Sequence, residues 1–270
     1  MTRPDSSPPR GIHFESVTVV VDDGRLPRTV VDDVSFSVQR GEMVAVMGPS
    51  GSGKSTLVNV ASGLVRPTRG QIVLDGLHPG DHGPAWWADR RRDTIGVVHQ
   101  RLNLLAGLSA LDNVAIALDL VGFRHKESRL QAMGALHRVG IAGAAATASE
   151  RLSVGEQQRV AIARAIAGDR PVLLADEPSA ALDRTSADEV TRLLAELARE
   201  GRAVLLVTHD SQQASWADRT MVLRDGRIAD RIEPAPPTAG PETRPPPPAG
   251  ASPSADPTAT STIGADEATS

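Results

Sequence analysis

Residues 48–56 read Gly-Pro-Ser-Gly-Ser-Gly-Lys-Ser-Thr and directly follow the short apolar run of residues 43–47. Apolar residues at helical spacing continue over residues 57–64, so the stretch predicts a strand, a glycine-rich loop and a helix in that order. Residues 48–55 fit the pattern G-x-x-x-x-G-K-[ST] in full, and they lie between a predicted strand and a predicted helix, as the pattern requires. The stretch therefore predicts an α/β fold with a phosphate-binding loop.

Glycines in such a loop let successive backbone N–H groups point inward, and the helix N-terminus adds a dipole that favours an anion. Lys54 is expected to contact the β- and γ-phosphates of a nucleotide, and the Ser55 hydroxyl is expected to ligate Mg²⁺. Only two of the 29 basic residues are lysines, Lys54 and Lys126, so chance is a poor explanation for a lysine at this position. The expected nucleotide-binding residues of the loop are Gly48, Pro49, Ser50, Gly51, Ser52, Gly53, Lys54, Ser55 and Thr56.

Two carboxylates end a second apolar run, residues 172–177. In open α/β sheets nucleotides bind at the carboxyl ends of the strands. We expect Asp176 to hold Mg²⁺ and Glu177 to polarise the attacking water as a general base. The alternative is that both residues only cap the next helix. His209 follows the apolar residues 203–207 in the same way, and it is expected to contact the γ-phosphate unless it is a structural histidine.

The remaining runs predict the rest of the fold. Continuous apolar runs at residues 95–98, 172–175 and 203–207 are typical of buried parallel strands, and residues 110–167 carry helical patterns without a convincing strand. Residues 12–21 and 30–38 predict an antiparallel strand pair, and Asp225-Gly226 predicts a hairpin turn between two further strands. We therefore expect a P-loop NTPase with a mostly parallel core sheet, an N-terminal antiparallel β subdomain and an inserted α-helical subdomain.

Composition excludes several classes of protein. The chain of 270 residues has no cysteine, which excludes a disulfide scaffold, a thiol nucleophile and thiolate metal sites. No stretch approaches the roughly 18 consecutive apolar residues of a spanning helix, and the first residues lack the apolar core of a signal peptide. These features predict a cytoplasmic protein. Only six residues are aromatic, three Trp and three Phe, with no Tyr, so the core must consist of aliphatic residues.

The formal charge of -4 equals that of residues 233–270 alone, which hold five acidic residues and one basic residue. The rest of the chain is electrically neutral, and such a balance argues against a nucleic-acid partner. Residues 233–270 are rich in Pro, Ala and Thr, and they are expected to be a disordered tail. The alternative is a tether or a partner-binding polyproline II segment. We expect a disordered N-terminus over residues 1–11 and a single domain over residues 12–232.

These segments, in this order, resemble the ATP-binding subunits of ABC transporters. Residues 152–159, Leu-Ser-Val-Gly-Glu-Gln-Gln-Arg, look like the signature motif of that family, and residues 160–165 look like the helix that it opens. Gln100 matches the Q-loop glutamine, and Asp183 matches the D-loop aspartate. Residues 101–105 with the segment just beyond them are similar to the branch that includes macrolide-export and lipoprotein-release ATPases.

The resemblance implies a mechanism with ATP and Mg²⁺ as cofactors. Two copies, or one copy and a related ATPase, would pack head to tail, with each ATP held between one subunit's phosphate loop and the Ser153 and Gly155 of the other. Gln100 would sense the γ-phosphate and Mg²⁺, and Asp183 would bridge the two sites. The helical insert, about residues 101–158, would dock on an integral membrane permease. The chain would thus be peripheral on the inner face of the cell membrane, with the permease as its only membrane contact.

The resulting function is ATP hydrolysis that drives a separate permease. The alternative is a slow or degenerate nucleotide switch that regulates a membrane partner without transport. A third class, the ABC ATPases that act on nucleic acid or ribosomes, usually carries paired cassettes or a long coiled coil, and the sequence predicts neither.

Two positions depart from the family pattern. Val154 stands where the signature motif usually has Gly, and a β-branched residue would be strained there if the site needed a positive φ. We expect Val154 to slow dimer closure. Val20 or Val21 stands where the family commonly stacks an aromatic ring on adenine. Of the two, we expect Val21 to contact the base. Discrimination between ATP and GTP is then expected to be weak, unless another side chain stacks from elsewhere.

Trp86 and Trp87 are followed by three arginines, Arg90, Arg91 and Arg92. This cluster suggests a nucleic-acid or lipid contact. We favour an amphipathic helix with solvated arginines, because the domain is neutral overall.

Overall fold

The structure is a computed structural model that describes residues 10–232, apart from positions 23, 25, 79, 81 and 101. The expectations for residues 1–9 and for the tail 233–270 lie outside these described residues, as does Arg101 at the start of the expected helical insert. Gly11 already belongs to a strand, so the folded part begins one residue before the expected boundary.

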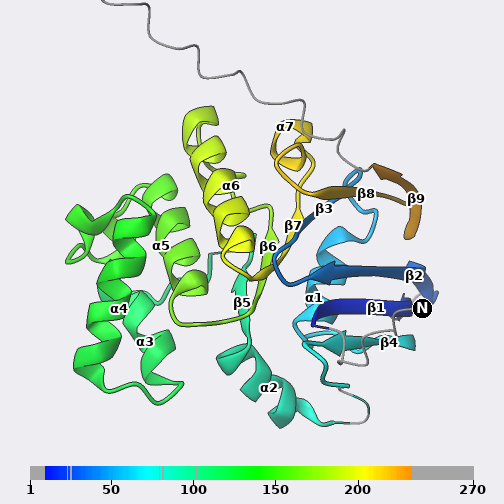
Figure 1. Ribbon diagram of the computed structural model, residues 1–270, viewed down its shortest axis with the longest axis horizontal. Helices are drawn as coiled ribbons and strands as arrows, with labels where there is room; N and C mark the ends of the chain where they lie inside the picture. Colours follow the sequence, from blue (N-terminus) through cyan, green and yellow to red (C-terminus); the bar gives the residue numbers. More distant parts are fainter. Residues whose placement is uncertain are drawn as a thin grey trace, which may run out of the picture. The chain divides into compact units, whose positions relative to one another are not determined.

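A six-stranded sheet forms the centre of the described part, in the order β5-β6-β7-β3-β8-β9 (Figure 1). All neighbouring strands in it are parallel except β8 and β9, which form an antiparallel hairpin. Every residue of β6 and β7 is buried, which explains why their sequences are apolar without alternation. The strands are β3 (Met43–Met47), β5 (Ile95–Val98), β6 (Val172–Asp176), β7 (Ala203–Val207), β8 (Arg219–Arg224) and β9 (Arg227–Ile232).

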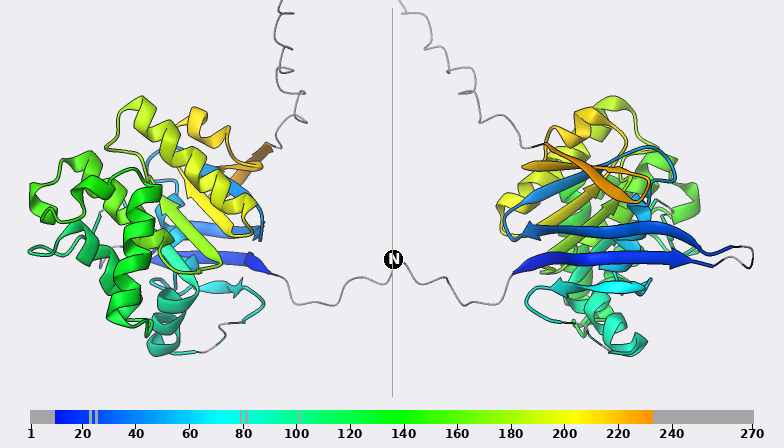
Figure 2. Two further views of the ribbon diagram at one scale, coloured as in Figure 1. Left: turned by 60° about the vertical axis from the view of Figure 1, so that its left-hand side comes forward. Right: turned by 90° about the vertical axis from the view of Figure 1, so that its right-hand side faces the viewer.

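A second, antiparallel sheet has the order β2-β1-β4. Its strands are β1 (Gly11–Val21), β2 (Arg28–Gln39) and β4 (Arg69–Leu74). The expected pairing of β1 with β2 is confirmed, and Figure 2 shows these two long strands side by side. The strand β4 was not expected from the sequence, because only its last three residues are buried.

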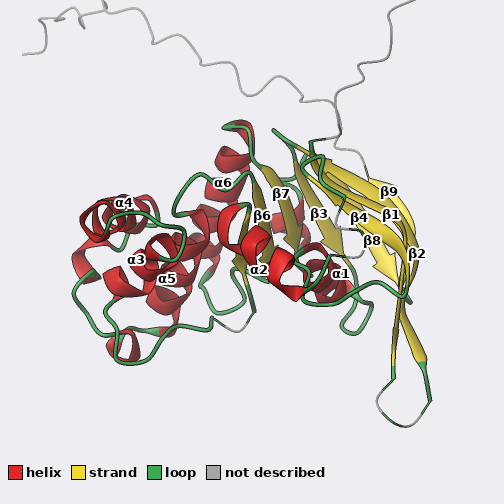
Figure 3. Cartoon of the chain, turned by 90° about the horizontal axis from the view of Figure 1, so that it is seen from below, coloured by secondary structure: helices red, strands yellow, loops and turns green. Residues whose placement is uncertain are grey.

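The helices lie on both faces of the six-stranded sheet. They are α1 (Lys54–Ala61), α2 (Pro84–Asp93), α3 (Ala110–Asp119), α4 (His125–Arg138), α5 (Val154–Ile166), α6 (Arg184–Arg199) and α7 (Ser211–Ala214), with two 3₁₀ turns, η1 (Ala142–Ala144) and η2 (Ser149–Arg151). Figure 3 shows α3, α4 and α5 grouped on one side, with the antiparallel sheet on the other. The expected group of helices is therefore present, and α5 extends beyond the expected end of the insert at residue 158.

Two hydrophobic cores result, and β3 separates them. Met43 and Ala45 point into the core shared with α3 to α6, whereas Val44 and Val46 point into the core shared with α1 and the antiparallel sheet. This alternation follows from the two-residue period of a strand. It leaves the carboxyl end of β3, and the loop that follows, between the two cores.

The helix α2 was expected as an amphipathic helix. None of its residues is fully buried, but Trp87 packs against the core shared with α1 and the antiparallel sheet. Arg91 is not simply solvated, because its Nη1 donates to the carbonyl oxygen of Ser62 at 3.1 Å. The Trp86 ring stacks on His82 with 4.9 Å between centroids, and the Arg90 guanidinium lies 5.5 Å from the Trp86 centroid. The aromatic residues are thus already engaged with neighbours in the chain.

The hairpin turn between β8 and β9 lies against the phosphate loop. Gly226 has a φ of 78°, and its N–H donates to the Ser52 carbonyl oxygen at 3.2 Å. Its own carbonyl oxygen accepts from the Asp32 N–H at 2.8 Å. A Cβ at this position would lie 2.7 Å from the Val30 carbonyl oxygen, so only glycine fits. The turn therefore joins the phosphate loop to β2.

Candidate functional site

The phosphate loop runs from the end of β3 to the first turn of α1, where the sequence predicts it. Gly53 ends the loop with a φ of 103°, and a Cβ there would lie 2.5 Å from the Val30 carbonyl oxygen. This close approach of β2 fixes the loop against the antiparallel sheet. At Gly51 a Cβ would meet no described atom within 4 Å, so the loop is open on the side that a ligand would approach.

The polar groups of the loop are arranged for an anion. Lys54 Nζ donates to the carbonyl oxygens of Gly48 and Pro49, at 2.9 Å and 3.0 Å. Ser52 Oγ is buried and has no hydrogen-bond partner among the described residues, a costly state for a hydroxyl group. The first turn of α1 holds no acidic residue, so nothing there opposes a negative charge. A phosphate group fits these features.

Ser55 and Asp176 lie together beside the loop. Ser55 Oγ donates to Asp176 Oδ1 at 3.1 Å, and burial, with a smaller contribution from Glu177, raises the pKa of Asp176. A hydroxyl and a carboxylate oxygen are donors that suit Mg²⁺. No group of three or more His, Cys, Asp and Glu residues in the described part of the chain could hold a metal ion. A magnesium ion here would therefore need the phosphate oxygens of a nucleotide and water to complete its shell.

Glu177 and His209 form a pair at the carboxyl ends of β6 and β7. His209 Nδ1 lies 2.9 Å from both Glu177 Oε1 and Glu177 Oε2. Glu177 has a φ of 50°, a conformation that costs a non-glycine residue about 1–3 kcal/mol. Its N–H donates to the Val207 carbonyl oxygen at 2.9 Å, which holds the backbone in place. The fold thus keeps a strained carboxylate beside the phosphate loop.

These groups surround one cavity of about 570 Å³. Its lining residues are Arg28, Val30, Gly48, Pro49, Ser50, Gly51, Gly53, Lys54, Ser55, Thr56, Gln100, Glu177, Ala180 and His209. Ser52 lies behind the loop and Asp176 lies below Ser55, so neither lines the cavity itself. The structure therefore brings most of the expected residues into one place.

Val21 does not line this cavity. It is 45% exposed, and in the β1–β2 ladder its partner is Arg28, which does line the cavity. The expectation of a base contact at Val21 followed from the family resemblance, whereas the cavity is lined by the residue paired with Val21 on the neighbouring strand. No signal in the sequence singles out Arg28, because its place follows from the register of the two strands.

Arg164 is a second residue that the sequence did not single out. It comes from α5, and its guanidinium donates to the carbonyl oxygens of Leu102 and Asn103, both at 2.7 Å. These carbonyls follow Gln100, which lines the cavity. Next to Gln100, burial lowers the pKa of His99, although the nearby Asp176 opposes this shift. The segment after β5 is therefore attached to the same helix that carries the signature residues.

The signature residues lie outside this cavity. Ser153 caps α5 in a capping box: its Oγ donates to Glu156 Oε2 at 2.8 Å and accepts from the Glu156 N–H at 3.3 Å. The Ser153 N–H also donates to Glu156 Oε2 at 2.8 Å. These bonds lower the pKa of Glu156. The N-terminus of α5 thus already holds a carboxylate.

Val154 is the first residue of α5 and has no positive φ. The condition for strain at this position is therefore not met, because an ordinary helical conformation accepts a β-branched residue. The side chain is 59% exposed. Next to it, a Cβ at Gly155 would lie 3.3 Å from Leu182 Cδ2. Leu182 precedes Asp183, which caps α6 by accepting from the Ser186 N–H at 3.1 Å.

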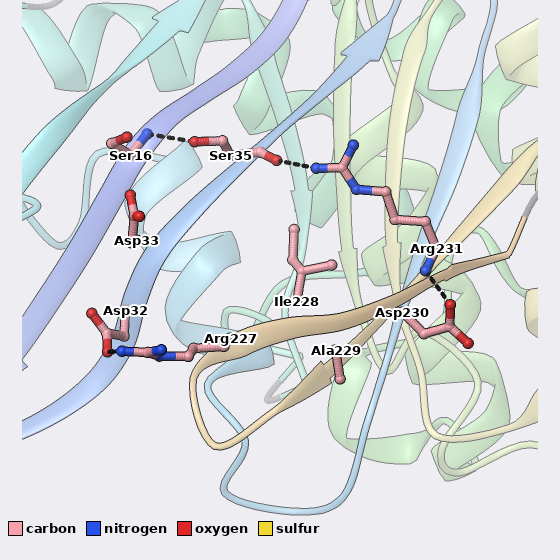
Figure 4. A pocket seen from close by; sticks show the side chains of 9 residues that line it. All are labelled: Ser16, Asp32, Asp33, Ser35, Arg227, Ile228, Ala229, Asp230 and Arg231. Carbon is pink, nitrogen blue, oxygen red and sulfur yellow. Dashed lines mark hydrogen bonds and ion pairs between the residues drawn. The ribbon is translucent and has the colours of Figure 1, made fainter.

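A second cavity, of about 680 Å³, lies between β2 and β9 (Figure 4). Most of its charged groups already have partners in the chain. Arg227 pairs with Asp32 at 2.6 Å, and Arg231 Nη2 donates to the Ser35 carbonyl oxygen at 3.0 Å. It contains none of the expected site residues.

Comparisons with known proteins agree with the geometry. The family model described as ABC transporter matches residues 31–180. The chain is 42% identical over 231 residues to the macrolide export ATP-binding/permease protein MacB of Rhodospirillum rubrum, covering 85% of this chain and 36% of that protein. It is 41% identical over 199 residues to the uncharacterized ABC transporter ATP-binding protein YvrO of Bacillus subtilis, covering 74% and 87%.

Solved structures give the same result. The dimeric structure of MJ0796, a bacterial ABC transporter cassette, has a TM-score of 0.79 and 36% identity, covering 82% of this chain and 98% of that chain. A post-hydrolysis state of MJ0796 bound to ADP and Pi also has a TM-score of 0.79, with 35% identity, covering 82% of this chain and 98% of that chain. The present chain spans about a third of the length of the MacB relatives that it matches. No helix in its described part is long and apolar enough to cross a membrane.

Proposed function

This chain belongs to the ABC transporter family, and we propose that it binds ATP with Mg²⁺ and hydrolyses ATP to drive a separate membrane permease. One observation carries the proposal: the phosphate loop, Glu177 and His209 line a single cavity. We also propose that residues 12–232 form the nucleotide domain and that residues of about 101–158 form its insert.

Phosphate binding follows from the groups that the loop holds in place. The Lys54 ammonium would leave the carbonyl oxygens of Gly48 and Pro49 and bind the β- and γ-phosphates. Ser52 Oγ would gain a partner for its buried hydroxyl. The backbone N–H groups of residues 50–56 and the N-terminus of α1 would supply the remaining donors.

Ser55, Asp176 and Gln100 would hold Mg²⁺ together with the phosphate oxygens. The ion would neutralise charge on the β- and γ-phosphates. Asp176 needs to be ionised for this role, and its burial disfavours the charged form in the absence of a cation.

Glu177 would act as the general base. It would accept a proton from a water molecule while the water oxygen bonds to the γ-phosphorus and the bond from that phosphorus to the β–γ bridging oxygen breaks. The hydrogen bond with His209 Nδ1 would orient the carboxylate, and the other nitrogen of the ring would face the γ-phosphate. The products are ADP and inorganic phosphate.

The second half of each site would come from another subunit. In a head-to-tail dimer, Ser153 and Gly155 of one copy would meet the γ-phosphate held by the loop of the other, and Asp183 would lie between the two sites. The dimeric structure of MJ0796 supports this arrangement. The name of the MacB relatives, ATP-binding/permease protein, supports a permease partner, which the helical insert would contact at the inner face of the membrane.

A regulatory switch with slow hydrolysis is the alternative. The observation that favours it is Val154, an exposed aliphatic residue at the N-terminus of α5, on the face that would close on the partner subunit.

The test is hydrolysis by the full chain, alone and in membranes with its permease. We expect Mg²⁺-dependent hydrolysis that Glu177→Gln lowers by about 10²–10⁴-fold, as for loss of a general base, with ATP binding retained. Failure of the wild-type chain to bind ATP would overturn the proposal. Hydrolysis that the permease and its substrate leave unchanged would favour the switch.

A further inference from the structure

The nucleotide cavity extends beyond the phosphate loop along β2. Val30 lies where β2 meets the loop, because its carbonyl oxygen would be 2.5 Å from a Cβ at Gly53. Arg28 is two residues away on the same strand, so it lies on the same face, about 6.6 Å further along β2. Both residues line the cavity. Whatever occupies the cavity therefore meets Val30 next to its phosphate groups and Arg28 beyond them.

Arg28 is exposed, and its guanidinium has no hydrogen-bond or ion-pair partner among the described residues. Other arginines of the same region do have partners. Arg40 pairs with Asp75 at 2.5 Å, and Arg227 pairs with Asp32 at 2.6 Å. The Arg28 guanidinium is thus free to meet a ligand without breaking an existing contact.

The base of a nucleotide needs a flat, weakly hydrated surface, and no Phe or Trp lines this cavity. The guanidinium of arginine is planar and stacks on aromatic rings, which a lysine ammonium does not do in the same way. The lining offers one other cationic side chain, Lys54, and it lies at the phosphate end. Opposite Arg28 in the ladder stands Val21, on the same face of the sheet, where it can support the aliphatic part of the arginine.

We propose that Arg28 covers the base of the bound nucleotide, with its guanidinium plane stacked on the purine ring. This inference rests on the proposed function, since it requires the phosphates in the loop. The phosphates themselves are already served by Lys54, the loop N–H groups and the N-terminus of α1. The cation–π contact recognises the face of the ring rather than its edge, so it favours purines without separating ATP from GTP.

The experiment measures dissociation constants by calorimetry for ATP and for inorganic tripolyphosphate, which has the charge of the phosphates but no base. The full chain is compared with Arg28→Ala, Arg28→Lys and Arg28→Trp. The matched control is Arg69→Ala, because Arg69 is an exposed arginine of the same antiparallel sheet that does not line the cavity. Unfolding midpoints establish that each variant is folded.

We expect Arg28→Ala to weaken ATP binding by about five- to twentyfold and to leave tripolyphosphate binding unchanged. Arg28→Lys should not restore ATP binding, Arg28→Trp should restore it, and Arg69→Ala should match the wild type. An equal loss for ATP and tripolyphosphate with rescue by Arg28→Lys would overturn the proposal in favour of a phosphate contact. Unchanged ATP binding in Arg28→Ala would also overturn it. Failure of the wild-type chain to bind ATP would instead count against the proposed function.

Discussion

The N-termini of α1 and α5 are prepared for a phosphate group in opposite ways. Helix α1 begins after Gly53, with no side-chain cap from the described residues and no acidic residue in its first turn. Helix α5 begins with Ser153, whose N–H and hydroxyl are both bonded to the Glu156 carboxylate. The first terminus is ready for an anion within one chain. In the proposed dimer the second would exchange its own carboxylate for a phosphate that the partner subunit presents.

The largest expected effect is a loss of ATP binding that distinguishes the N-terminus of α1 from that of α5. Lys54→Ala should weaken ATP binding more than about 100-fold, since it removes the cation on the phosphates, whereas Ser153→Arg should leave ATP binding by a single chain within twofold. Ser153→Arg should still abolish hydrolysis, because the long side chain would keep the N-terminus of α5 away from the γ-phosphate in the proposed dimer. Calorimetry and phosphate release measure the two properties. Lys126→Ala, at the other lysine, is the control, and equal loss of binding in both site variants would refute the contrast.

The second-largest effect is expected at Arg164, which joins α5 to the segment that follows Gln100. Arg164→Met leaves the carbonyls of Leu102 and Asn103 unpaired, which should lower the free energy of unfolding by about 1–3 kcal/mol and hydrolysis by about tenfold, with ATP binding retained. Denaturant unfolding and a kcat measurement test this. Arg192→Met is the control, because Arg192 makes only an exposed pair with Glu196. If Arg164→Met weakened ATP binding as much as it lowered hydrolysis, Arg164 would instead be needed for binding at the phosphate loop.

Two serine variants should change stability in opposite directions. Ser153→Ala removes a helix cap and should lower the free energy of unfolding by about 1 kcal/mol. Ser52→Ala removes a buried hydroxyl without a partner, so the ligand-free protein should be as stable as the wild type or more stable. Thermal unfolding with and without ATP provides the measurement. A smaller stabilisation by ATP in Ser52→Ala is also expected, and a destabilised ligand-free Ser52→Ala would contradict the assignment of an unpaired hydroxyl.

Acid should weaken the N-terminal caps of α5 and α6. Hydrogen bonds from Ser153 lower the pKa of Glu156, and backbone hydrogen bonds at Ser186 lower the pKa of Asp183. A lowered pKa means that the contribution to stability is present above the ordinary carboxyl pKa and is lost as the pH falls through the lowered value. Protection from amide exchange over residues 153–157 and 183–187, taken relative to the intrinsic exchange rate at each pH, should therefore fall below about pH 4. Unchanged protection there down to pH 2 would show that these caps do not hold the helices.

The smallest effect is expected at Val154. Its conformation is unstrained, so Val154→Gly should not stabilise the chain, and the greater flexibility of glycine should cost less than about 1 kcal/mol. The hypothesis that Val154 slows dimer closure stays a prediction, now based on side-chain bulk at an exposed position. It requires faster hydrolysis in Val154→Gly and an intermediate rate in Val154→Ala. Identical rates in all three proteins would reject it.

The sequence was sufficient for the parts of the fold that depend on local pattern. The buried strands β6 and β7 are continuous apolar runs, and the phosphate loop is fixed by glycines, Lys54 and its position between strand and helix. The strand β4 escaped prediction because half of it is exposed. The helix α2 was placed correctly, and Trp87 packs against a hydrophobic core, although no residue of the helix is fully buried.

The lining of the cavity was predictable where a polar residue directly follows a buried apolar strand, as at Glu177 and His209. It was not predictable where the role of a residue comes from a distant neighbour. Arg164 acts on carbonyls about sixty residues earlier in the chain, and Arg28 lines the cavity because the register of β1 and β2 turns it towards the opening. A charged, exposed residue gives no pattern in the sequence that distinguishes it from solvated surface.

The bond between the Gly226 N–H and the Ser52 carbonyl oxygen bears on how this protein is made. The phosphate loop leaves the ribosome early, but the turn that supports it is synthesised about 170 residues later. Until then the loop lacks one of its supports, the hydrogen bonds that run from Ser52 through Gly226 to Asp32 of β2. A contact of such long sequence separation forms late in folding, so nascent chains that end before the hairpin should bind nucleotide poorly. Binding of ATP during synthesis would then indicate that the domain is complete.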